Sequence, residues 1–502
     1  MEQITVKEIV EAVGGTLLCG SPDQPVEHIS IDSRTMKGND LFVPLIGEKV
    51  DAHRFIGQAV ENGAAAVLTS EHTANTSEHA ANTGEHTADT GEHTADTEKH
   101  TADTGGETVL TGIHGPITAK CPFIRVKDTK KALQDIGRYY RARLTLPLIG
   151  VTGSVGKTTT REMIAAALSA GYRVYKTPGN HNSQVGVPIT ISEISKEDEI
   201  GVIELGMSEP GELTVIAQIA QIDMAVVTNI GITHIEQLGS QRNIYREKMT
   251  IQDGLKPGGI LLLNGDDEML KTTRARDGFK TLYYGTGENC DYRAVDLKLE
   301  DGCPSFTAVY GKERARVKLN IMGMHNVLNA LAALAAAREH GISMERAAVP
   351  LGTFTGFKNR QQIAEVNGIT VIDDTYNASP VSMKAGVDVL MSISNPGRKI
   401  AVLADMKELG EQAPEFHAEV GAYIGGKKPD QVLLLGELAR HIAEGIRRTD
   451  AVISVHCFDD KEELTEYLDS QLEKGDTVLF KGSNSMKLGE VSAHFLEGKT
   501  DR

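Results

Sequence analysis

The sequence lacks any apolar run close to the roughly 20 residues that a membrane-spanning helix requires. Its first residues also lack the apolar core of a secretory signal, and they carry acids at Glu2, Glu8 and Glu11. We therefore expect a cytoplasmic chain with no membrane span.

Cysteine and positive charge are also scarce. The five cysteines are scattered, and no two stand at CxxC spacing, which argues against a disulfide framework or a zinc site. The net charge of −17 argues against non-specific nucleic-acid binding. An anionic substrate would have to be held by local Lys or Arg side chains, helix N-termini or metal ions.

Residues 71–105 form a seven-residue repeat of the type EHTADTG whose only apolar residues are alanines. Without an apolar seam this repeat cannot be a coiled coil, so we interpret it as a solvated, mobile insertion. It carries five histidines, at positions 72, 79, 86, 93 and 100. Weak metal binding by these histidines is a minor alternative, because nothing fixes their geometry.

Deletion of residues 72–104 is expected to leave stability and activity nearly unchanged. The segment has no side chains able to join a core, and the entropy of a long surface loop grows only logarithmically with its length. Thermal unfolding and turnover of the deletion variant test this, and a large loss of either would show that the repeat has a structural or functional role.

A chain of 502 residues exceeds the size of a single core, so several domains are expected. Alternating strand and helix patterns predict an α/β protein of three domains, with parallel sheets in the second and third. The third is expected to be Rossmann-like, although it lacks a GxGxxG fingerprint for a dinucleotide. The expected boundaries are residues 1–128, interrupted by an insertion at 71–118, then 129–356 and 357–502.

The strongest local signal is the segment GVTGSVGKTT at residues 150–159. A buried strand, a glycine-rich turn and a helix follow one another directly, which points backbone N–H groups at phosphate oxygens. Gly153 and Gly156 supply the turn, although Val151 stands where the usual motif has its first glycine. Lys157 is expected to contact the β- and γ-phosphates, and Thr158 to ligate Mg²⁺.

Polar residues end two further strands of the predicted central sheet. Glu204 closes one strand, and His234 follows another. Because ligands collect at the carboxyl ends of parallel strands, Glu204 is a candidate magnesium ligand. Taken alone, however, Glu204 could equally be a solvated loop residue, and His234 a structural histidine.

Ten segments together resemble the Mur ligases and cover nearly the whole chain outside 71–118. They occur in the order GVTGSVGKTTTRE, GNHNSQVGVP, ELGMSEPGEL, TNIGITHIEQLGS, NGDDE, GMHNVLNALAALAA, GFKNRQQ, DDTYNASPVSM, LADMKELG and KGSNSM. GNHN and DDTYNASPVSM are most similar to the members that join D-alanyl-D-alanine to UDP-N-acetylmuramoyl-tripeptide, for peptidoglycan synthesis.

The resemblance implies a two-step reaction, in which ATP converts a substrate carboxylate to an acyl-phosphate and the incoming amine then displaces phosphate through a tetrahedral intermediate. It implies catalytic roles for Lys157, His234 and Lys248. Lys248 matches the position of a carbamylated lysine, which with Thr158, Glu204 and His234 would bind two Mg²⁺ ions. Without that modification, Lys248 would be a surface lysine paired with an acid such as Glu247.

The resemblance also assigns binding residues. For ATP they are Gly153, Ser154, Gly156, Lys157, Thr158, Thr159, His325, Asn326, Asn329, Arg360 and Asp374. For the UDP-linked precursor and the dipeptide they are Ser33, Arg34, Asn180, His181, Asn182, Ser208, Tyr376, Asn377, Lys481 and Ser483. The sequence departs from the family at Asn484, where an arginine often follows KGS, which weakens the assignment of a partner for the dipeptide carboxylate. A monomer is the family default.

Two other functions stay open at this stage. A sister ligase, adding a single amino acid as in other Mur ligases or in folylpolyglutamate synthesis, would keep Lys157, Glu204 and Lys248 and differ in the end domains. A P-loop binding or regulatory protein would use the same loop without ligation.

Overall fold

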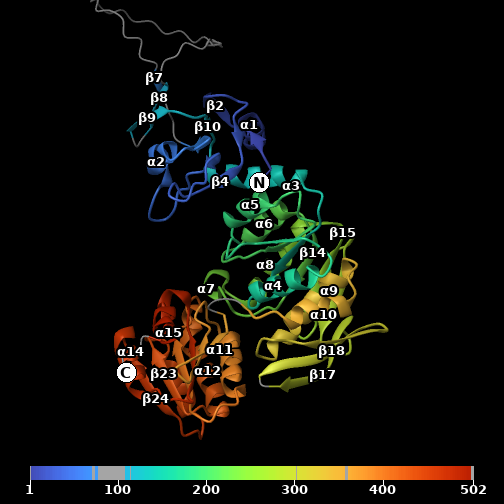
Figure 1. Cartoon of the computed structure of the whole chain (residues 1–502), viewed down its shortest axis with the longest axis vertical. Helices are drawn as coiled ribbons and strands as arrows, with labels where there is room; N and C mark the ends of the chain where they lie inside the picture. The colour runs from blue at the N-terminus through green and yellow to red at the C-terminus, as the bar shows by residue number, and fades with distance from the viewer. Residues whose placement is uncertain are drawn as a thin grey trace, which may run out of the picture. The chain divides into compact units, whose positions relative to one another are not determined.

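The computed structural model describes residues 2–70, 74–76, 108–112, 115–300, 302–356 and 360–498 (Figure 1). The chain forms two compact units. One comprises the chain to Arg143 together with Ile191–Ser195, and the other comprises Leu144–Thr190 and Lys196–Arg502. Most of the repeat, including its five histidines, lies outside the described residues, as do residues 357–359 of the GFKNRQQ segment.

The first unit is built on a five-stranded sheet, in which β2 is antiparallel to its neighbour and the other strands are parallel. The strand order is β2 (Thr16–Cys19), β10 (Phe123–Arg125), β6 (Ala66–Thr69), β5 (Asp40–Phe42) and β4 (His28–Ser30). A short pair is formed by β1 (Ile4–Thr5) and β3 (Pro25–Val26). The helices are α1 (Val6–Val13), α2 (Ile56–Glu61) and α3 (Thr129–Arg143).

Part of the expected insertion has regular structure. Strands β7 (Ala74–Thr76), β8 (Thr108–Gly112) and β9 (Gly115–Ala119) form a three-stranded antiparallel sheet. Within the repeat, interpreted from the sequence as a solvated, mobile insertion over 71–105, residues 74–76 are thus paired in a sheet. The segments TVLTG and GPITA hold β-branched residues, which favour paired strands, and they lie beyond the heptad repeat.

The second unit begins with a nine-stranded sheet in which the strands from β12 to β17 are parallel and the last two antiparallel. Its order is β12 (Val174–Lys176), β13 (Ile200–Glu204), β11 (Leu148–Thr152), β14 (Ile222–Val227), β15 (Leu255–Asn264), β16 (Lys280–Gly285), β17 (Tyr292–Glu300), β18 (Cys303–Tyr310) and β19 (Glu313–Lys318). The associated helices are α4 (Lys157–Leu168), α5 (Gly186–Glu193), α6 (Glu212–Ala220), α7 (Ile235–Leu238), α8 (Gln241–Met249), α9 (His325–Glu339) and α10 (Met344–Gly352).

Helices α4 and α9 share one apolar core with this sheet, which includes Ile149, Met163 and Leu331. The small alanines of α9 allow a neighbouring helix to approach closely, and Ala330 and Ala333 are fully buried. This packing holds the start of α9 beside the start of α4, where the glycine-rich loop ends.

The remaining described chain forms a six-stranded sheet that is parallel except for β20. Its order is β20 (Gln362–Val366), β21 (Ile369–Asp373), β25 (Thr477–Lys481), β22 (Lys399–Ala404), β23 (Gln431–Leu435) and β24 (Ser454–Phe458). The helices are α11 (Pro380–Ser392), α12 (Ala413–Lys427), α13 (Arg440–Arg447), α14 (Lys461–Gln471) and α15 (Leu488–Leu496).

Both faces of this sheet are covered. Leu434 and Leu403 belong to a core with α11, α12 and α13, whereas their neighbours Leu433 and Val402 belong to a core with α14 and α15. Successive side chains of a strand point to opposite faces, which explains the near-continuous apolar runs of these strands. The expected Rossmann-like sheet is thus present. Within the described ranges no helix is long and apolar enough to cross a membrane.

Candidate nucleotide and metal site

The glycine-rich loop connects β11 to α4, as expected from the sequence. Gly153 and Gly156 have positive φ angles of 147° and 85°. A Cβ atom at Gly153 would lie 1.8 Å from Oγ1 of Thr228, so a larger residue there would force the loop away from β14. Gly156 precedes the first residue of α4, and the helix N-terminus therefore faces the space enclosed by the loop.

Two residues after β14 hold the loop in place. The Asn229 side chain accepts a hydrogen bond from the backbone N–H of Val155 and donates one to the carbonyl of the same residue, both at 2.9 Å. The Thr228 hydroxyl donates to the Val155 carbonyl at 2.6 Å. These three bonds fix Val155 from both sides. The polar end of β14 was noted in the sequence, but the role of Asn229 was not predicted.

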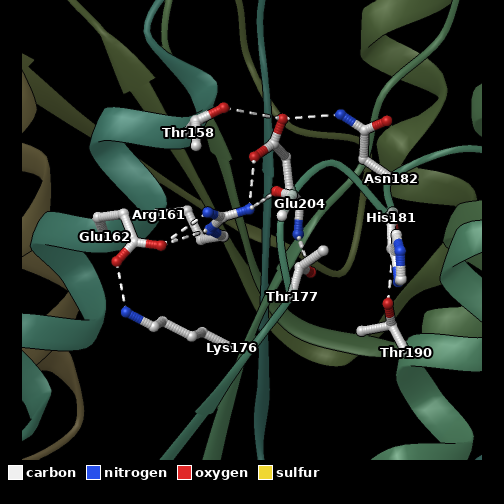
Figure 2. A network of polar contacts seen from close by, with 10 residues as sticks. Thr158, Arg161, Glu162, Lys176, Thr177, His181, Asn182, Thr190 and Glu204 are labelled. Carbon is white, nitrogen blue, oxygen red and sulfur yellow. Dashed lines mark hydrogen bonds and ion pairs between the residues drawn. The ribbon is translucent and has the colours of Figure 1, made fainter. Parts of the chain in front are cut away.

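Lys157 and Thr158 stand at the first turn of α4. The ammonium of Lys157 donates to the carbonyls of Gly153 and Ser154, at 2.9 and 3.4 Å, and so closes the loop on itself. Burial lowers the pKa of Lys157; the Glu204 carboxylate opposes this change, and the Arg360 charge adds to it. The hydroxyl of Thr158 lies 3.3 Å from Oε1 of Glu204 (Figure 2). The structure therefore brings the two predicted metal ligands together.

Glu204 is only 2% exposed, and polar side chains surround it (Figure 2). Asn182 donates to its Oε1 at 2.8 Å, and Arg161 donates to its Oε2 at 3.0 Å. Its backbone N–H donates to the Thr177 hydroxyl at 2.9 Å. Of the predicted GNHN residues, only Asn182 reaches this carboxylate, whereas Asn180 and His181 are exposed.

His234 lies at the start of α7 with a positive φ of 61°. Its Nδ1 is 2.6 Å from Oε2 of Glu408, and this contact holds the pKa of Glu408 below its usual range. Lys248 lies on α8, as expected, and is 2% exposed. Burial, reinforced by the positive charge of Lys157, lowers the pKa of Lys248 well below its usual range, although Glu247 opposes the change. The alternative of a surface lysine is therefore wrong.

The start of α9 approaches the loop through asparagines. Asn329 accepts from the Thr160 hydroxyl at 3.0 Å and donates to Asn326 at 2.9 Å. Asn326 in turn donates to the carbonyl of Met322 at 2.7 Å. Both asparagines are buried, so the predicted nucleotide residues also join α9 to α4.

A second cluster of charged side chains lies at the carboxyl ends of β21 and β25. The ammonium of Lys481 is 2.6 Å from Oδ2 of Asp374 and 3.1 Å from the carbonyl of Asn377. The guanidinium of Arg360 lies 4.0 Å from the centre of the Tyr376 ring, a cation–π contact. The Ser483 hydroxyl accepts from the backbone N–H of Lys407 at 2.9 Å.

Replacement of Lys481 by methionine is expected to reduce the free energy of unfolding by about 3–5 kcal/mol, because it leaves the largely buried carboxylate of Asp374 without its partner. The side chains of Lys481 and Asp374 are only 2% and 12% exposed. Urea unfolding followed by circular dichroism provides the measurement. Lys461→Met, which breaks a solvent-exposed pair with Glu490, is the control and should leave the unfolding midpoint unchanged. Equal midpoints for the two variants would contradict the prediction.

A cavity of about 890 Å³ collects most of the predicted residues. Its lining includes Ser154, Gly156, Lys157, Thr158, Thr159, Asn182, Glu204, Ser208, His234, His325, Asn326, Asn329, Arg360, Asp374, Tyr376, Asn377 and Lys481. Gly153, Asn180, His181, Lys248 and Ser483 are not part of the lining. Asp266 and Asp267 also line it, although the sequence analysis gave them no role.

Ser33 and Arg34 lie in the other compact unit. The Ser33 hydroxyl donates to Gln58 at 2.8 Å and is buried. The guanidinium of Arg34 pairs with Asp32 at 2.7 Å, and its side chain is 79% exposed. Arg34 is thus available to an anionic group in solvent, whereas Ser33 is already engaged.

A glycine-rich loop at the end of a parallel strand, with a threonine and a buried glutamate at its mouth, defines a P-loop nucleotide-binding enzyme. Three family models match the chain: "Mur ligase family, catalytic domain" at residues 25–141, "Mur ligase middle domain" at 151–337, and "Mur ligase, glutamate ligase domain" at 359–484.

Similar proteins agree with this result. The UDP-N-acetylmuramoyl-tripeptide–D-alanyl-D-alanine ligase of Bacillus subtilis is 37% identical over 98% of both chains. A crystal structure of MurF from Acinetobacter baumannii superimposes with a TM-score of 0.84 over 99% of both chains, at 28% identity. The MurF ligase of Thermotoga maritima, solved in complex with ADP, has a TM-score of 0.75 at 28% identity and covers 94% of this chain and 98% of that one.

The chain belongs to the Mur ligase family. The expectations of an ATP-dependent amide-forming ligase and of a three-domain α/β fold are thereby confirmed.

Proposed function

We propose that this enzyme uses ATP to join D-alanyl-D-alanine to UDP-N-acetylmuramoyl-tripeptide, which yields the pentapeptide precursor of peptidoglycan. The observation that carries the proposal is the similarity over 98% of both chains to the Bacillus subtilis ligase named for this reaction. The cavity around Lys157, Thr158 and Glu204 supports it, because it combines a phosphate-binding loop with a carboxylate that can hold a cation.

The chemistry explains why ATP is required. A carboxylate is a poor electrophile, so one of its oxygens first attacks the γ-phosphorus and ADP leaves. The amine of the dipeptide then attacks the carbonyl carbon of the acyl-phosphate; the tetrahedral intermediate expels inorganic phosphate, and the nitrogen loses a proton. Lys157 and the backbone N–H groups of the loop would bind the phosphate oxygens while negative charge shifts from one oxygen to another during the transfer.

The donor set at the mouth of the loop fits Mg²⁺. The Thr158 hydroxyl and Oε1 of Glu204 are both oxygen ligands, and they lie 3.3 Å apart. Bound Mg²⁺ neutralises charge on phosphate oxygens. We assign Thr158 and Glu204 to one ion, and His234 with a carbamylated Lys248 to a second.

The environment of Lys248 supports this modification. Carbamylation requires a neutral amine, whose nitrogen attacks CO₂ and then loses a proton to give an anionic carbamate. Because burial lowers the pKa of Lys248 well below its usual range, the neutral amine is favoured. The carbamate would replace this buried neutral amine with an anion, which the positive charge of Lys157 would favour.

The remaining roles divide among the three proposed domains, 1–128, 129–356 and 357–502. Ser33 and Arg34 of the first would hold the UDP group, and Asn180, His181, Asn182 and Ser208 of the second the precursor peptide. His325, Asn326, Asn329, Arg360 and Asp374 would surround the nucleotide. Tyr376, Asn377, Lys481 and Ser483 would contact the dipeptide.

We further propose that the enzyme acts in the cytoplasm as a monomer. Size-exclusion chromatography with light scattering tests the monomer directly, and a mass twice that of the chain would overturn it. Cell fractionation tests the location.

Release of ADP in the presence of UDP-N-acetylmuramoyl-tripeptide, with and without D-alanyl-D-alanine, tests the reaction. Product formation only with the dipeptide is the expected result. Turnover with a single amino acid in its place would identify a sister ligase, whereas absence of any substrate-dependent ADP release would favour a binding or regulatory protein.

A further inference from the structure

Arg161 lies one turn after Lys157 on α4, and its side chain is 4% exposed. Its Nη1 donates to Oε2 of Glu204 at 3.0 Å and to the carbonyl of Gly179 at 2.9 Å (Figure 2). One nitrogen therefore joins the metal-binding carboxylate to the loop that carries Asn182.

The two oxygens of Glu204 have different neighbours as a result. Oε2 is held by Arg161, whereas Oε1 faces Asn182 and the Thr158 hydroxyl (Figure 2). Only Oε1 is directed to the position where Thr158 would share a cation. Arg161 thus occupies Oε2 and leaves Oε1 on the side of Thr158.

A second acid, Glu162, pairs with the other edge of the Arg161 guanidinium. Nε and Nη2 of Arg161 donate to Oε1 of Glu162 at 3.2 and 2.6 Å, and Oε2 of Glu162 pairs with Lys176. Charges therefore alternate along Lys176, Glu162, Arg161 and Glu204, and the side-chain exposure falls from 48% to 13%, 4% and 2%. Glu162 shares the positive charge of Arg161, which would otherwise act on Glu204 alone.

We propose that Arg161 is a positioning residue for the metal ion: it holds Oε2 of Glu204 so that Oε1 is available to Mg²⁺, and it ties the 178–182 loop to the same carboxylate. The proposal rests on the assignment of Glu204 as a Mg²⁺ ligand. Without Arg161, Oε2 of Glu204 loses this donor, and Asn182 and Thr158 hold the carboxylate through Oε1 alone. Contacts that orient metal ligands typically change metal affinity 10–100-fold when they are removed.

The experiment measures how strongly Mg²⁺ and nucleotide support one another. Isothermal titration with β,γ-imido-ATP, in excess Mg²⁺ and in EDTA, gives two nucleotide affinities whose ratio is the contribution of the metal. Arg161→Gln is expected to reduce this ratio about 10–100-fold while the affinity in EDTA stays the same. Arg161→Lys, which keeps one donor and the charge, should fall between Arg161→Gln and the wild type.

Two further variants complete the series. Glu162→Gln leaves Arg161 in place but removes the acid that shares its positive charge, so a smaller reduction of the same ratio is expected. Arg161→Lys, which keeps the charge and loses donors, serves as the test if Arg161→Gln does not fold. Lys176→Gln, at the exposed end of the chain of charges, is the matched control and should behave as the wild type.

An increase in the ratio of the two nucleotide affinities would be equally informative. If the charge of Arg161 only competed with the metal, its removal would strengthen the effect of Mg²⁺, and this result or an unchanged ratio would overturn the proposal. A parallel loss in EDTA and in Mg²⁺ would show a general structural role and would also overturn it. If the wild-type protein itself shows no effect of Mg²⁺, the assignment of the metal site is wrong, which is a different outcome.

Discussion

Lys157→Ala is expected to reduce the rate of ligation about 10²–10³-fold while the fold is retained. The Lys157 ammonium already donates to the Gly153 and Ser154 carbonyls, which places it within the curve of the loop. There the ammonium can neutralise the negative charge of the phosphate oxygens during phosphoryl transfer. The nearby cation Arg161 is committed to Glu204 and Glu162, so it cannot replace Lys157.

Substrate-dependent ADP release measures this effect, and circular dichroism establishes that the variant is folded. Lys157→Met, which keeps most of the side-chain volume, separates the loss of charge from the loss of packing and should be equally inactive. Lys176→Ala is the matched control on the exposed side of the same network. Near-normal turnover of Lys157→Ala would refute the assignment of the P-loop.

Lys248→Ala is expected to be nearly inactive, and short carboxylic acids such as formate or acetate should restore part of its rate. The side chain fills a buried space, and its removal leaves room for a small anion where the carbamate would lie. Lys248→Arg should not recover activity, because the guanidinium keeps its positive charge and would repel the metal. Restoration of the rate by short carboxylic acids therefore tests whether a negative charge, rather than a long side chain, is required at this position.

Removal of CO₂ provides an independent measurement. Activity of the wild type should fall in CO₂-depleted buffer and return with bicarbonate, and ¹³C-bicarbonate should produce a carbamate signal in the NMR spectrum. Lys256→Ala, which breaks a half-exposed pair with Asp223 and keeps Lys248, is the control and should respond to CO₂ removal and to ¹³C-bicarbonate as the wild type does. Lys248→Ala should give no carbamate signal. Full activity of Lys248→Ala would refute the modification.

The sequence was sufficient to locate the glycine-rich loop and one candidate metal ligand. The signal at residues 150–159 is local, because a strand, two glycines of positive φ and a helix start follow one another without a gap. Glu204 could be assigned to the same edge because the carboxyl ends of parallel strands meet there, and the structure places its strand β13 directly beside β11. The hydrophobic periodicity of the elements and their order along the chain carry this information.

Some elements had weaker signals. Strands β17 to β19 were not predicted; β17 is exposed over its second half, whereas the alternation of buried and exposed residues in β19 was a usable signal for a half-buried strand. Arg161 was overlooked although it lies three residues after Thr158, on the same face of α4. That spacing was a usable signal for two side chains that meet one carboxylate.

Tertiary structure alone decided the partners of the charged residues. Lys481 and Asp374 are 107 positions apart, and they meet because β21 and β25 are adjacent in the sheet. The burial of Lys248, and with it the direction of its pKa, depends on how α8 packs rather than on its neighbours in the chain. The sequence by itself determined the position of the glycine-rich loop, where we propose that phosphate binds. Which charges are shielded from water, and therefore which of them interact strongly, depends on strand order and helix packing that no local pattern records.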